Sequence, residues 1–238
     1  MTSARFSFAD SVRAVLFDAG NTLMWIDHAR IAGILSAHGV TADEPSVRLA
    51  EMRARPAIDA YLASSRRREG PAAVAESVAR VLHEMGTVPS VGVRAEIVAD
   101  LTSVWPSLWN CPAADAHETL STLASRGFAL GVVSNSNGTV AASLLAAGLG
   151  AHLAVIVDSS TEGIEKPDPR LFLRAAERLG ASPHHCVYVG DLFAVDVQGA
   201  RGAGMHAVLL DPVGAWASAV PSQTDRVSGL TELASRLC

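Results

Sequence analysis

The fold is decided by the stretch Arg13-Ala-Val-Leu-Phe-Asp18, an apolar run that ends in a carboxylate. Its length and its Val and Phe content predict a buried strand over residues 13–18. The chain continues Ala19-Gly20-Asn21-Thr22-Leu23, which is typical of a turn. Ligands of parallel α/β sheets bind at the carboxyl ends of the strands. Asp18 is therefore the first candidate functional residue.

Three further segments place polar groups at or near the ends of apolar runs. Gly131-Val-Val-Ser134-Asn135 ends in a hydroxyl and an amide. Val187-Tyr-Val-Gly190-Asp191 ends in an acid, and Asp196 follows five residues later. Glu165-Lys166-Pro167 brings a cation into a turn, and this is the only lysine among 19 basic side chains. A compact ammonium used once, among arginines, indicates a specific function for Lys166.

Apolar runs alternate with helical patterns over most of the chain. The predicted strands cover residues 13–18, 128–134, 153–158, 186–191 and 205–210. Between the third and fourth of them, apolar residues recur at helical spacing over residues 171–179. This alternation predicts an α/β fold with a doubly wound parallel sheet.

The alternation stops over residues 28–112, where no convincing strand is found. Four helical patterns take its place, over residues 28–38, 44–64, 71–85 and 91–104. We interpret residues 28–112 as an all-helical cap domain, and residues 1–27 and 113–238 as the α/β core domain. Three arginines at 66–68 form a short basic run, which we expect to be a solvated helix end.

Composition excludes several classes of protein. A chain of 238 residues with 49% hydrophobic residues is long enough for a large α/β domain with a smaller insert. No apolar run has the length of a membrane span, and the first ten residues lack the pattern of a signal peptide. A net charge of -5 gives no reason to expect nucleic acid as a partner. Three scattered cysteines suit a reducing cytoplasm, so we expect a cytoplasmic protein. We expect it to be a monomer or a homodimer.

In chain order, Asp18, Ser134, Lys166 and the pair Asp191 and Asp196 resemble the four motifs of the haloacid dehalogenase superfamily. The resemblance covers nearly the whole chain. It implies a Rossmann-like core, a helical cap inserted after the first motif, and a hydrolase that acts on a small phosphorylated metabolite. It also implies Mg²⁺ as the cofactor, which oxygen ligands suit.

The resemblance gives each residue an expected role. Asp18 would be the nucleophile and form an aspartyl-phosphate, and its reference pKa of about 3.9 keeps it ionised at neutral pH. The expected magnesium ligands are Asp18, the carbonyl of Gly20, Asp191 and Asp196. The expected phosphate-binding residues are Ser134, Asn135, Lys166 and Thr22. Lys166 would also offset charge on the nucleophile and the phosphoryl group.

Gly20 departs from the superfamily pattern. Phosphatases of the superfamily have a second Asp there, which protonates the leaving group and then activates water. Such general acid–base catalysis contributes about 10² to 10⁴-fold. A phosphatase without it needs either an acid from elsewhere, with Asp27 and His28 the nearest candidates, or a substrate with a good leaving group.

Two alternatives to a phosphatase stay open. In a 2-haloacid dehalogenase the Asp attacks carbon without metal, and dehalogenases of this superfamily also lack the second Asp. A slow or non-catalytic relative that only binds phosphorylated ligands would not need it either. The Gly190-Asp191 pair favours a metal site and hence the phosphatase. Phosphonoacetaldehyde hydrolases need a lysine in the cap, which residues 28–112 lack.

Overall fold

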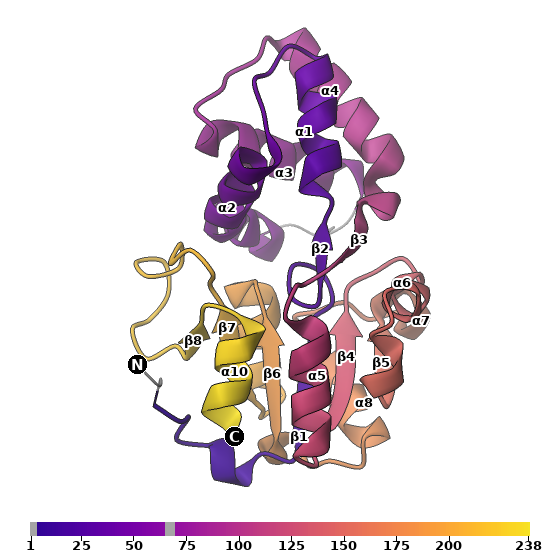
Figure 1. The fold of residues 1–238 in the computed structure, drawn as a ribbon, viewed down its shortest axis with the longest axis vertical. Helices are drawn as coiled ribbons and strands as arrows, with labels where there is room; N and C mark the ends of the chain where they lie inside the picture. Colours follow the sequence, from indigo (N-terminus) through magenta and orange to yellow (C-terminus); the bar gives the residue numbers. More distant parts are fainter. Residues whose placement is uncertain (1–3, 65–69) are drawn as a thin grey trace.

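The computed structural model describes residues 4–64 and 70–238, so the basic run at 66–68 lies outside the described residues. A six-stranded parallel sheet with the strand order β5-β4-β1-β6-β7-β8 forms the lower part of the molecule (Figure 1). Its strands are β1 Ala14–Phe17, β4 Ala129–Ser134, β5 Val155–Asp158, β6 Cys186–Gly190, β7 His206–Leu210 and β8 Arg226–Val227. All five predicted strands are confirmed, each shortened by one or two residues, and β8 is an addition.

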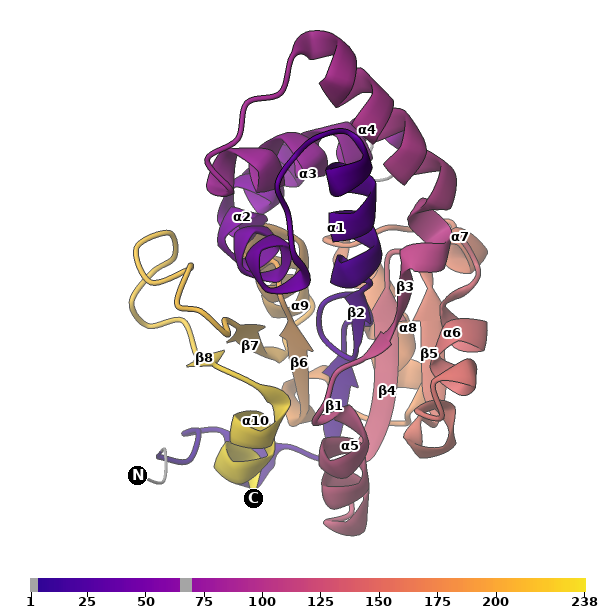
Figure 2. The ribbon, with the colours of Figure 1, turned by 45° about the horizontal axis from the view of Figure 1, so that its top comes forward.

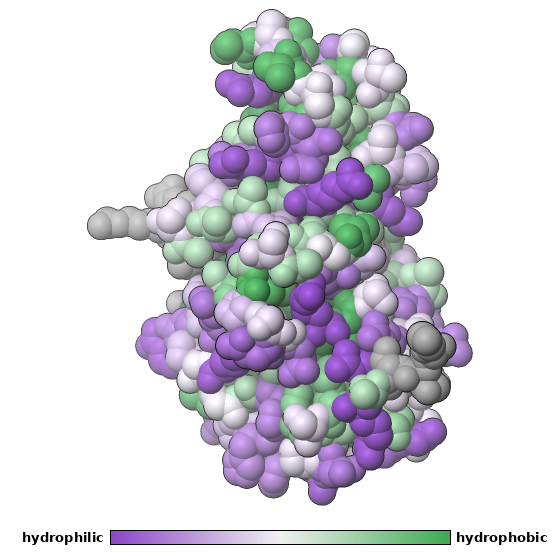
Figure 3. All heavy atoms as spheres, turned by 90° about the vertical axis from the view of Figure 1, so that its left-hand side faces the viewer, coloured by the Kyte–Doolittle hydropathy of each residue, from purple (hydrophilic) through white to green (hydrophobic). Residues whose placement is uncertain are grey.

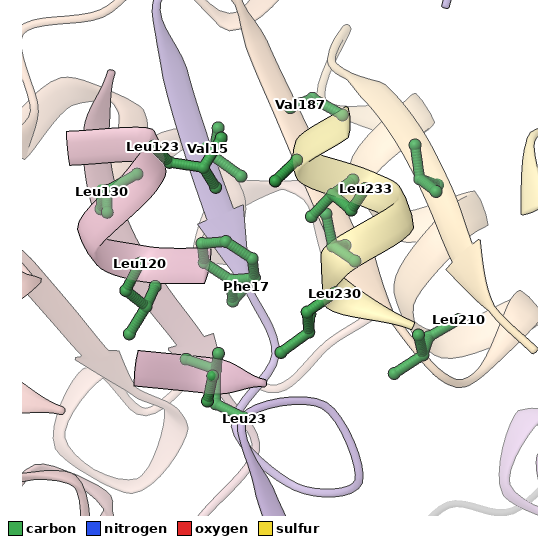
Figure 4. Close-up of a cluster of buried hydrophobic side chains, with 14 of the residues drawn as sticks. Val15, Phe17, Leu23, Leu120, Leu123, Leu130, Val187, Leu210, Leu230 and Leu233 are labelled. Atoms are coloured by element: carbon green, nitrogen blue, oxygen red, sulfur yellow. The ribbon is translucent and has the colours of Figure 1, made fainter. Parts of the chain in front are cut away.

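Helices cover both faces of the sheet, as a doubly wound fold requires. In β1, Val15 and Phe17 enter one hydrophobic cluster, whereas Ala14 and Leu16 enter the other. Figure 4 shows Phe17 between α5 and α10 on the first face. The helices of this part are α5 Ala116–Ser125, α6 Val140–Ala146, α7 Ser159–Glu162, α8 Pro169–Arg178, α9 Gln198–Gly202 and α10 Leu230–Leu237. Strands buried on both faces explain the continuous apolar runs in the sequence.

Four further helices lie above the carboxyl edge of the sheet (Figures 1 and 2). They are α1 His28–Ala37, α2 Glu44–Ser64, α3 Pro71–Glu84 and α4 Val91–Val104, at the predicted positions. They bury a hydrophobic cluster of their own, which includes Leu35, Val78 and Ile97. A separate cluster is consistent with a cap domain, and the boundaries at residues 28 and 112 stay a prediction.

A short antiparallel ribbon joins the two parts where the chain crosses between them. It consists of β2 Met24–Ile26 and β3 Trp109–Pro112. The expectation that residues 28–112 contain no strand is therefore wrong at β3. Strand pairing here joins segments far apart in sequence, and β2 and β3 are too short for an alternating pattern to emerge.

Two further sequence expectations bear on the surroundings of the protein. Among the described helices, none is both long enough and apolar enough to cross a membrane. The three cysteines are free, and Cys186 is buried as an apolar residue at the start of β6.

Candidate active site

Three carboxylates meet at the carboxyl edge of the sheet. Asp18 follows β1 and Asp191 follows β6, and these two strands are direct neighbours with Phe17 opposite Val189. Asp196 lies on a single π-helical turn, η5 Phe193–Val197. One oxygen of each acid lies within 4.8 Å of the others, and all three side chains are buried.

Lys166 occupies the centre of this acidic cluster. Its Nζ donates hydrogen bonds to Asp18 Oδ1 at 2.6 Å, Asp196 Oδ1 at 2.8 Å and Tyr188 Oη at 3.0 Å. Burial disfavours the charged ammonium, but Asp18 and Asp196 outweigh it and raise the pKa of Lys166 above its usual value. The single lysine is therefore a buried, charged group aimed at the carboxylate of Asp18.

Burial also acts on the acids. It raises the pKa of Asp18 to about 6, although the charge of Lys166 opposes the rise. It raises the pKa of Asp191 well above the usual value, against the charge of Arg55. Buried carboxylates in such a group repel one another, and a divalent cation between them relieves that repulsion.

The donor set fits Mg²⁺, which prefers oxygen ligands and often needs only one or two carboxylates. Asp196 is already engaged, because Oδ1 accepts from Lys166 and Oδ2 accepts from the backbone N–H of Leu192 at 3.0 Å. Asp18 and Asp191 are thus the better candidates for direct ligands, with Asp196 acting through water. The carbonyl of Gly20 stays a proposed ligand.

Gly190 leaves room for this arrangement. A Cβ added to Gly190 would lie 2.5 Å from both Cγ and Oδ2 of Asp196. Real Cβ atoms do not approach other atoms so closely, so any side chain at position 190 must displace Asp196.

We expect Gly190→Ala to weaken the apparent affinity for Mg²⁺ and to lower the activity, each by about 10 to 100-fold. This is the usual effect of disturbing the groups around a metal site. The measurement is a titration of activity with Mg²⁺. Gly33→Ala is the matched control, because a Cβ at this exposed position of α1 meets nothing within 4 Å. A magnesium titration of Gly190→Ala that overlays that of Gly33→Ala would show that the position of Asp196 is unimportant.

Ser134 and Asn135 lie on the same edge, at the end of β4. Ser134 is buried and lines the cavity beside Lys166. The Asn135 side chain accepts from the backbone N–H of Lys166 at 2.8 Å and donates to its carbonyl at 3.2 Å. It therefore fixes the Lys166 loop, and a phosphate contact from Asn135 would have to come from its main-chain N–H.

The turn after Asp18 differs from expectation at Thr22. Its side chain is fully buried and does not line the cavity, so it is not placed for the predicted phosphate contact. The reason is the backbone of the turn, in which Asn21 has a positive φ of 54°. Asn21 faces the cavity instead, and its Nδ2 donates to Glu51 Oε1 at 2.9 Å.

Neither candidate for a replacement acid reaches the cavity. Asp27 accepts a hydrogen bond from the backbone N–H of Arg30 and caps α1. His28 is buried, and its Nε2 lies 3.7 Å from Glu51 Oε2. Neither residue lines the described cavity, so neither is placed to protonate a leaving group there.

A charged stripe on α2 contributes to the site, and sequence analysis missed it. Glu51, Arg55 and Asp59 recur every four residues, so they share one face of the helix. Such a stripe normally marks a solvated face, yet Arg55 and Asp59 are buried. The spacing and the type of these residues alone could not distinguish the two situations.

Arg55 and Asp59 connect α2 to the loop that carries Asp191 and Asp196. Arg55 Nε lies 3.5 Å from Asp191 Oδ2. Asp59 Oδ2 accepts from the backbone N–H of Ala194 at 2.8 Å. Although burial opposes it, the charge of Arg55 lowers the pKa of Glu51 to about 2, so Glu51 is ionised and is not an acid catalyst. Burial raises the pKa of Asp59 to about 6.

The geometry described above accords with a comparison against known families. A model of the haloacid dehalogenase-like hydrolases matches residues 12–204. The chain belongs to this family. The match spans all four motif positions and the helical interval between the first two, so the family covers both parts of the fold.

Several known proteins are similar to the chain. A glyceraldehyde 3-phosphate phosphatase of Methanopyrus kandleri is 39% identical over 98 residues, which are 41% of this chain and 42% of that protein. A phosphoserine phosphatase of Thermus thermophilus is 39% identical over 98 residues, or 41% of this chain and 39% of that protein. The chain thus matches less than half the length of these relatives. The solved 2-haloacid dehalogenase of Pseudomonas syringae pv. Tomato DC3000 is 27% identical with a TM-score of 0.56, covering 95% of this chain and 98% of that one.

Proposed function

We propose that this hydrolase is a Mg²⁺-dependent phosphatase that acts on a small phosphorylated metabolite through an aspartyl-phosphate. The observation that carries the proposal is the buried Lys166 held by Asp18 and Asp196, which form a cluster with Asp191 at the carboxyl edge of the sheet. Relatives named as phosphatases of glyceraldehyde 3-phosphate and of phosphoserine support the same class of reaction.

In the proposed reaction Asp18, Lys166 and Ser134 have different roles. A carboxylate oxygen of Asp18 attacks phosphorus, the bond from phosphorus to the ester oxygen breaks, and the leaving group departs with the bonding electrons. Water then attacks the aspartyl-phosphate, the bond from phosphorus to the Asp18 oxygen breaks, and the proton of water passes to a phosphate oxygen. Lys166 offsets the negative charge in both steps, and Ser134 donates its hydroxyl to a phosphoryl oxygen.

Mg²⁺ fits the oxygen donors of Asp18 and Asp191, and when bound it would offset charge on the phosphoryl oxygens. Nε of Arg55 lies 3.5 Å from Asp191, and Lys166 pairs with Asp18 and Asp196, so each of these two cations lies next to an acid of the cluster. The cap helices above the site would exclude bulk water during attack.

The covalent intermediate offers the direct test. The enzyme would be mixed with an aryl phosphate and Mg²⁺, quenched with acid within milliseconds to seconds, and digested for mass spectrometry. We expect added phosphate on the peptide that contains Asp18. Phosphate turnover without any phosphorylated peptide, at all quench times, would contradict the proposed intermediate. Absence of both turnover and phosphorylated peptide with many phosphate esters would favour a relative that only binds phosphorylated ligands.

A 2-haloacid dehalogenase is the second candidate, and Gly20 is the observation that favours it. In that reaction Asp18 attacks the carbon that carries the halogen, halide leaves without protonation, and water hydrolyses the resulting ester. No general acid is needed for halide, which suits a glycine at position 20. The likeness to the dehalogenase of Pseudomonas syringae adds support. Halide release from a 2-haloacid distinguishes the two candidates.

Because Gly20 carries no acid and neither Asp27 nor His28 lines the described cavity, the rate should depend strongly on the acidity of the leaving group. We expect aryl and acyl phosphates to react at least about 10²-fold faster than alkyl phosphates such as sugar phosphates, the size of a general-acid effect. The measurement is kcat/KM for a series of phosphate esters. Equal values for alkyl and aryl esters would reveal an acid that neither Asp27 nor His28 supplies in this geometry.

Restoring a general acid at position 20 requires a second substitution, because the side chain of Trp109 lies against Gly20. A Cβ at Gly20 would lie 3.1 Å from Cζ3 of Trp109. We expect Gly20→Asp alone to leave alkyl phosphates slow, since the indole keeps the new carboxylate out of place. Gly20→Asp combined with Trp109→Ala should reduce the difference in kcat/KM between alkyl and aryl esters. Trp109→Ala alone is the control. If Gly20→Asp alone reduces this difference in kcat/KM, the indole of Trp109 moves aside freely.

A further inference from the structure

The cavity above Asp18 is large and reaches far into the cap. Its volume is about 530 Å³, within the range of small-molecule sites. It begins at the acidic cluster around Lys166 and continues between the cap helices as far as Leu82 and Leu101. Figure 3 shows apolar residues, in green, reaching the surface about halfway up, where the helical part meets the sheet part.

The polar and apolar parts of this cavity are segregated. The floor carries Asp18, Ser134, Lys166, Asp191 and Asp196, whereas the cap contributes mainly Ile, Leu, Val and Trp side chains. Among the described cap residues that line it, the charged ones are Glu51 and Arg55, and they pair with each other at 3.0 Å. The cavity therefore suits a ligand with a charged end on the floor and an apolar body in the cap.

A leaving group with several hydroxyls would find too few hydrogen-bond partners in this cap. Each sugar hydroxyl buried without a hydrogen bond costs free energy, and a second phosphate would cost more. Two described cap residues that line the cavity carry hydroxyls: that of Ser77 donates to the carbonyl of Ala73 at 2.9 Å, and that of Thr102 is buried without a partner. The Glu51–Arg55 pair engages Asn21 and, at 3.5 Å, Asp191, which leaves Nη1 of Arg55 without a partner. An apolar group, in contrast, gains free energy in proportion to the area that it buries.

Aromatic side chains border the place where the leaving group would lie. The ring of Trp109 occupies the space next to Gly20, two residues from the nucleophile. Trp105 meets Trp109 edge to face, with ring centroids 6.2 Å apart and an interplanar angle of 81°. Both indoles line the cavity, so an aromatic group placed there would have aromatic neighbours.

We propose that the substrate is an aryl phosphate monoester, whose phosphate lies on the acidic floor and whose aromatic leaving group fills the apolar cavity of the cap. This inference rests on the proposed phosphatase function and names its substrate class. An aryl oxide leaves with the bonding electrons and takes its proton from water, so it also needs no acid at position 20. One choice of substrate thus accounts for Gly20, for the indole against it and for the apolar cap.

The test compares three phosphates whose leaving groups all depart readily but differ in apolar size. These are 1-naphthyl, phenyl and acetyl phosphate, each assayed for kcat/KM. We expect 1-naphthyl phosphate to exceed phenyl phosphate by about tenfold, because the second ring buries additional apolar area. Acetyl phosphate should be the slowest despite its acidic leaving group.

A variant that fills the cavity should remove this preference. Val78 is a buried residue of α3 that lines the cavity. We expect Val78→Phe to reduce the ratio of kcat/KM for 1-naphthyl phosphate to kcat/KM for phenyl phosphate to within about twofold. The matched control is His83→Phe, which adds the same ring at an exposed position of α3 outside the cavity. The three-substrate comparison in the unmodified enzyme decides the question even if Val78→Phe does not fold.

A binding assay with ligands that the enzyme cannot cleave separates this inference from the proposed function. A naphthylmethylphosphonate, which the enzyme cannot cleave, should bind at least about tenfold more tightly than methylphosphonate and should change the tryptophan fluorescence. Similar kcat/KM for all three phosphates would overturn the inference and leave the phosphatase standing. Tight binding of the naphthyl phosphonate without hydrolysis of any phosphate would support the apolar ligand class and overturn the phosphatase. Neither binding nor hydrolysis would overturn both.

Discussion

Asp18→Asn is expected to abolish hydrolysis, with kcat/KM falling by on the order of 10⁴-fold or more, because an amide cannot act as the nucleophile. The fold should survive. In this variant Lys166 keeps its hydrogen bonds to Asp196 at 2.8 Å and Tyr188 at 3.0 Å, so its buried ammonium is not left without partners. The measurements are kcat/KM for an aryl phosphate and the melting temperature.

Asp211→Asn is the matched control for this variant. Asp211 is also a buried acid directly after a parallel strand, β7, but it pairs with Arg226 at 2.8 Å and does not line the cavity. We expect Asp211→Asn to lower the melting temperature and to keep kcat/KM near the parent value. Substantial phosphatase activity in Asp18→Asn would remove Asp18 from the role of nucleophile.

Lys166→Arg is expected to lower kcat/KM by about 10² to 10³-fold although it preserves the charge. The reason is shape, because the compact ammonium donates to three oxygens that surround it at 2.6 to 3.0 Å. A planar guanidinium cannot occupy that buried space without displacing Asp18 or Asp196. The conservative exchange Arg80→Lys, in an exposed pair with Glu76, should change nothing.

Lys166→Met separates the charge from the shape. It leaves Asp18 and Asp196 buried without their shared cation, which should destabilise the fold by about 3–5 kcal/mol, the usual cost of breaking a buried ion pair from one side. The measurement is denaturant unfolding of the parent, Lys166→Arg and Lys166→Met. Near-parent activity in Lys166→Arg would mean that Lys166 acts only as a diffuse charge and that its geometry is unimportant.

The sequence predicts those parts of the fold that follow from local patterns. Strands buried on both faces appear as apolar runs, and the cap helices follow the 3.6-residue period, so both lie within two residues of the prediction. The edge of the sheet follows from topology, because β1 and β6 are neighbours and their terminal acids must converge. The ribbon of β2 and β3 does not follow, since its pairing joins segments far apart in the chain.

The site is less predictable where the direction of a side chain decides whether a residue lines the cavity. Thr22 was expected at the phosphate, but the turn buries it below the cavity and presents Asn21 instead. Asn135 uses its amide on the backbone of Lys166, a partner that no sequence pattern indicates. Tyr188, which accepts from Lys166, could have been noticed as a polar residue inside an apolar strand. Gly20 indicates in the sequence that the usual general acid is missing. The contact between Gly20 and the indole of Trp109 is known only from the structure.

The dependence of activity on Mg²⁺ distinguishes attack of Asp18 on phosphorus from attack on carbon. Phosphate release from 4-nitrophenyl phosphate and halide release from 2-chloropropionate would be followed in the same preparation, first with Mg²⁺, then after chelation, then with Mg²⁺ restored. For a Mg²⁺-dependent phosphatase we expect phosphate release that is lost on chelation and recovered with Mg²⁺, with no halide at any stage. Halide release that is indifferent to the chelator, without release of phosphate, would contradict it and assign Asp18 to attack on carbon.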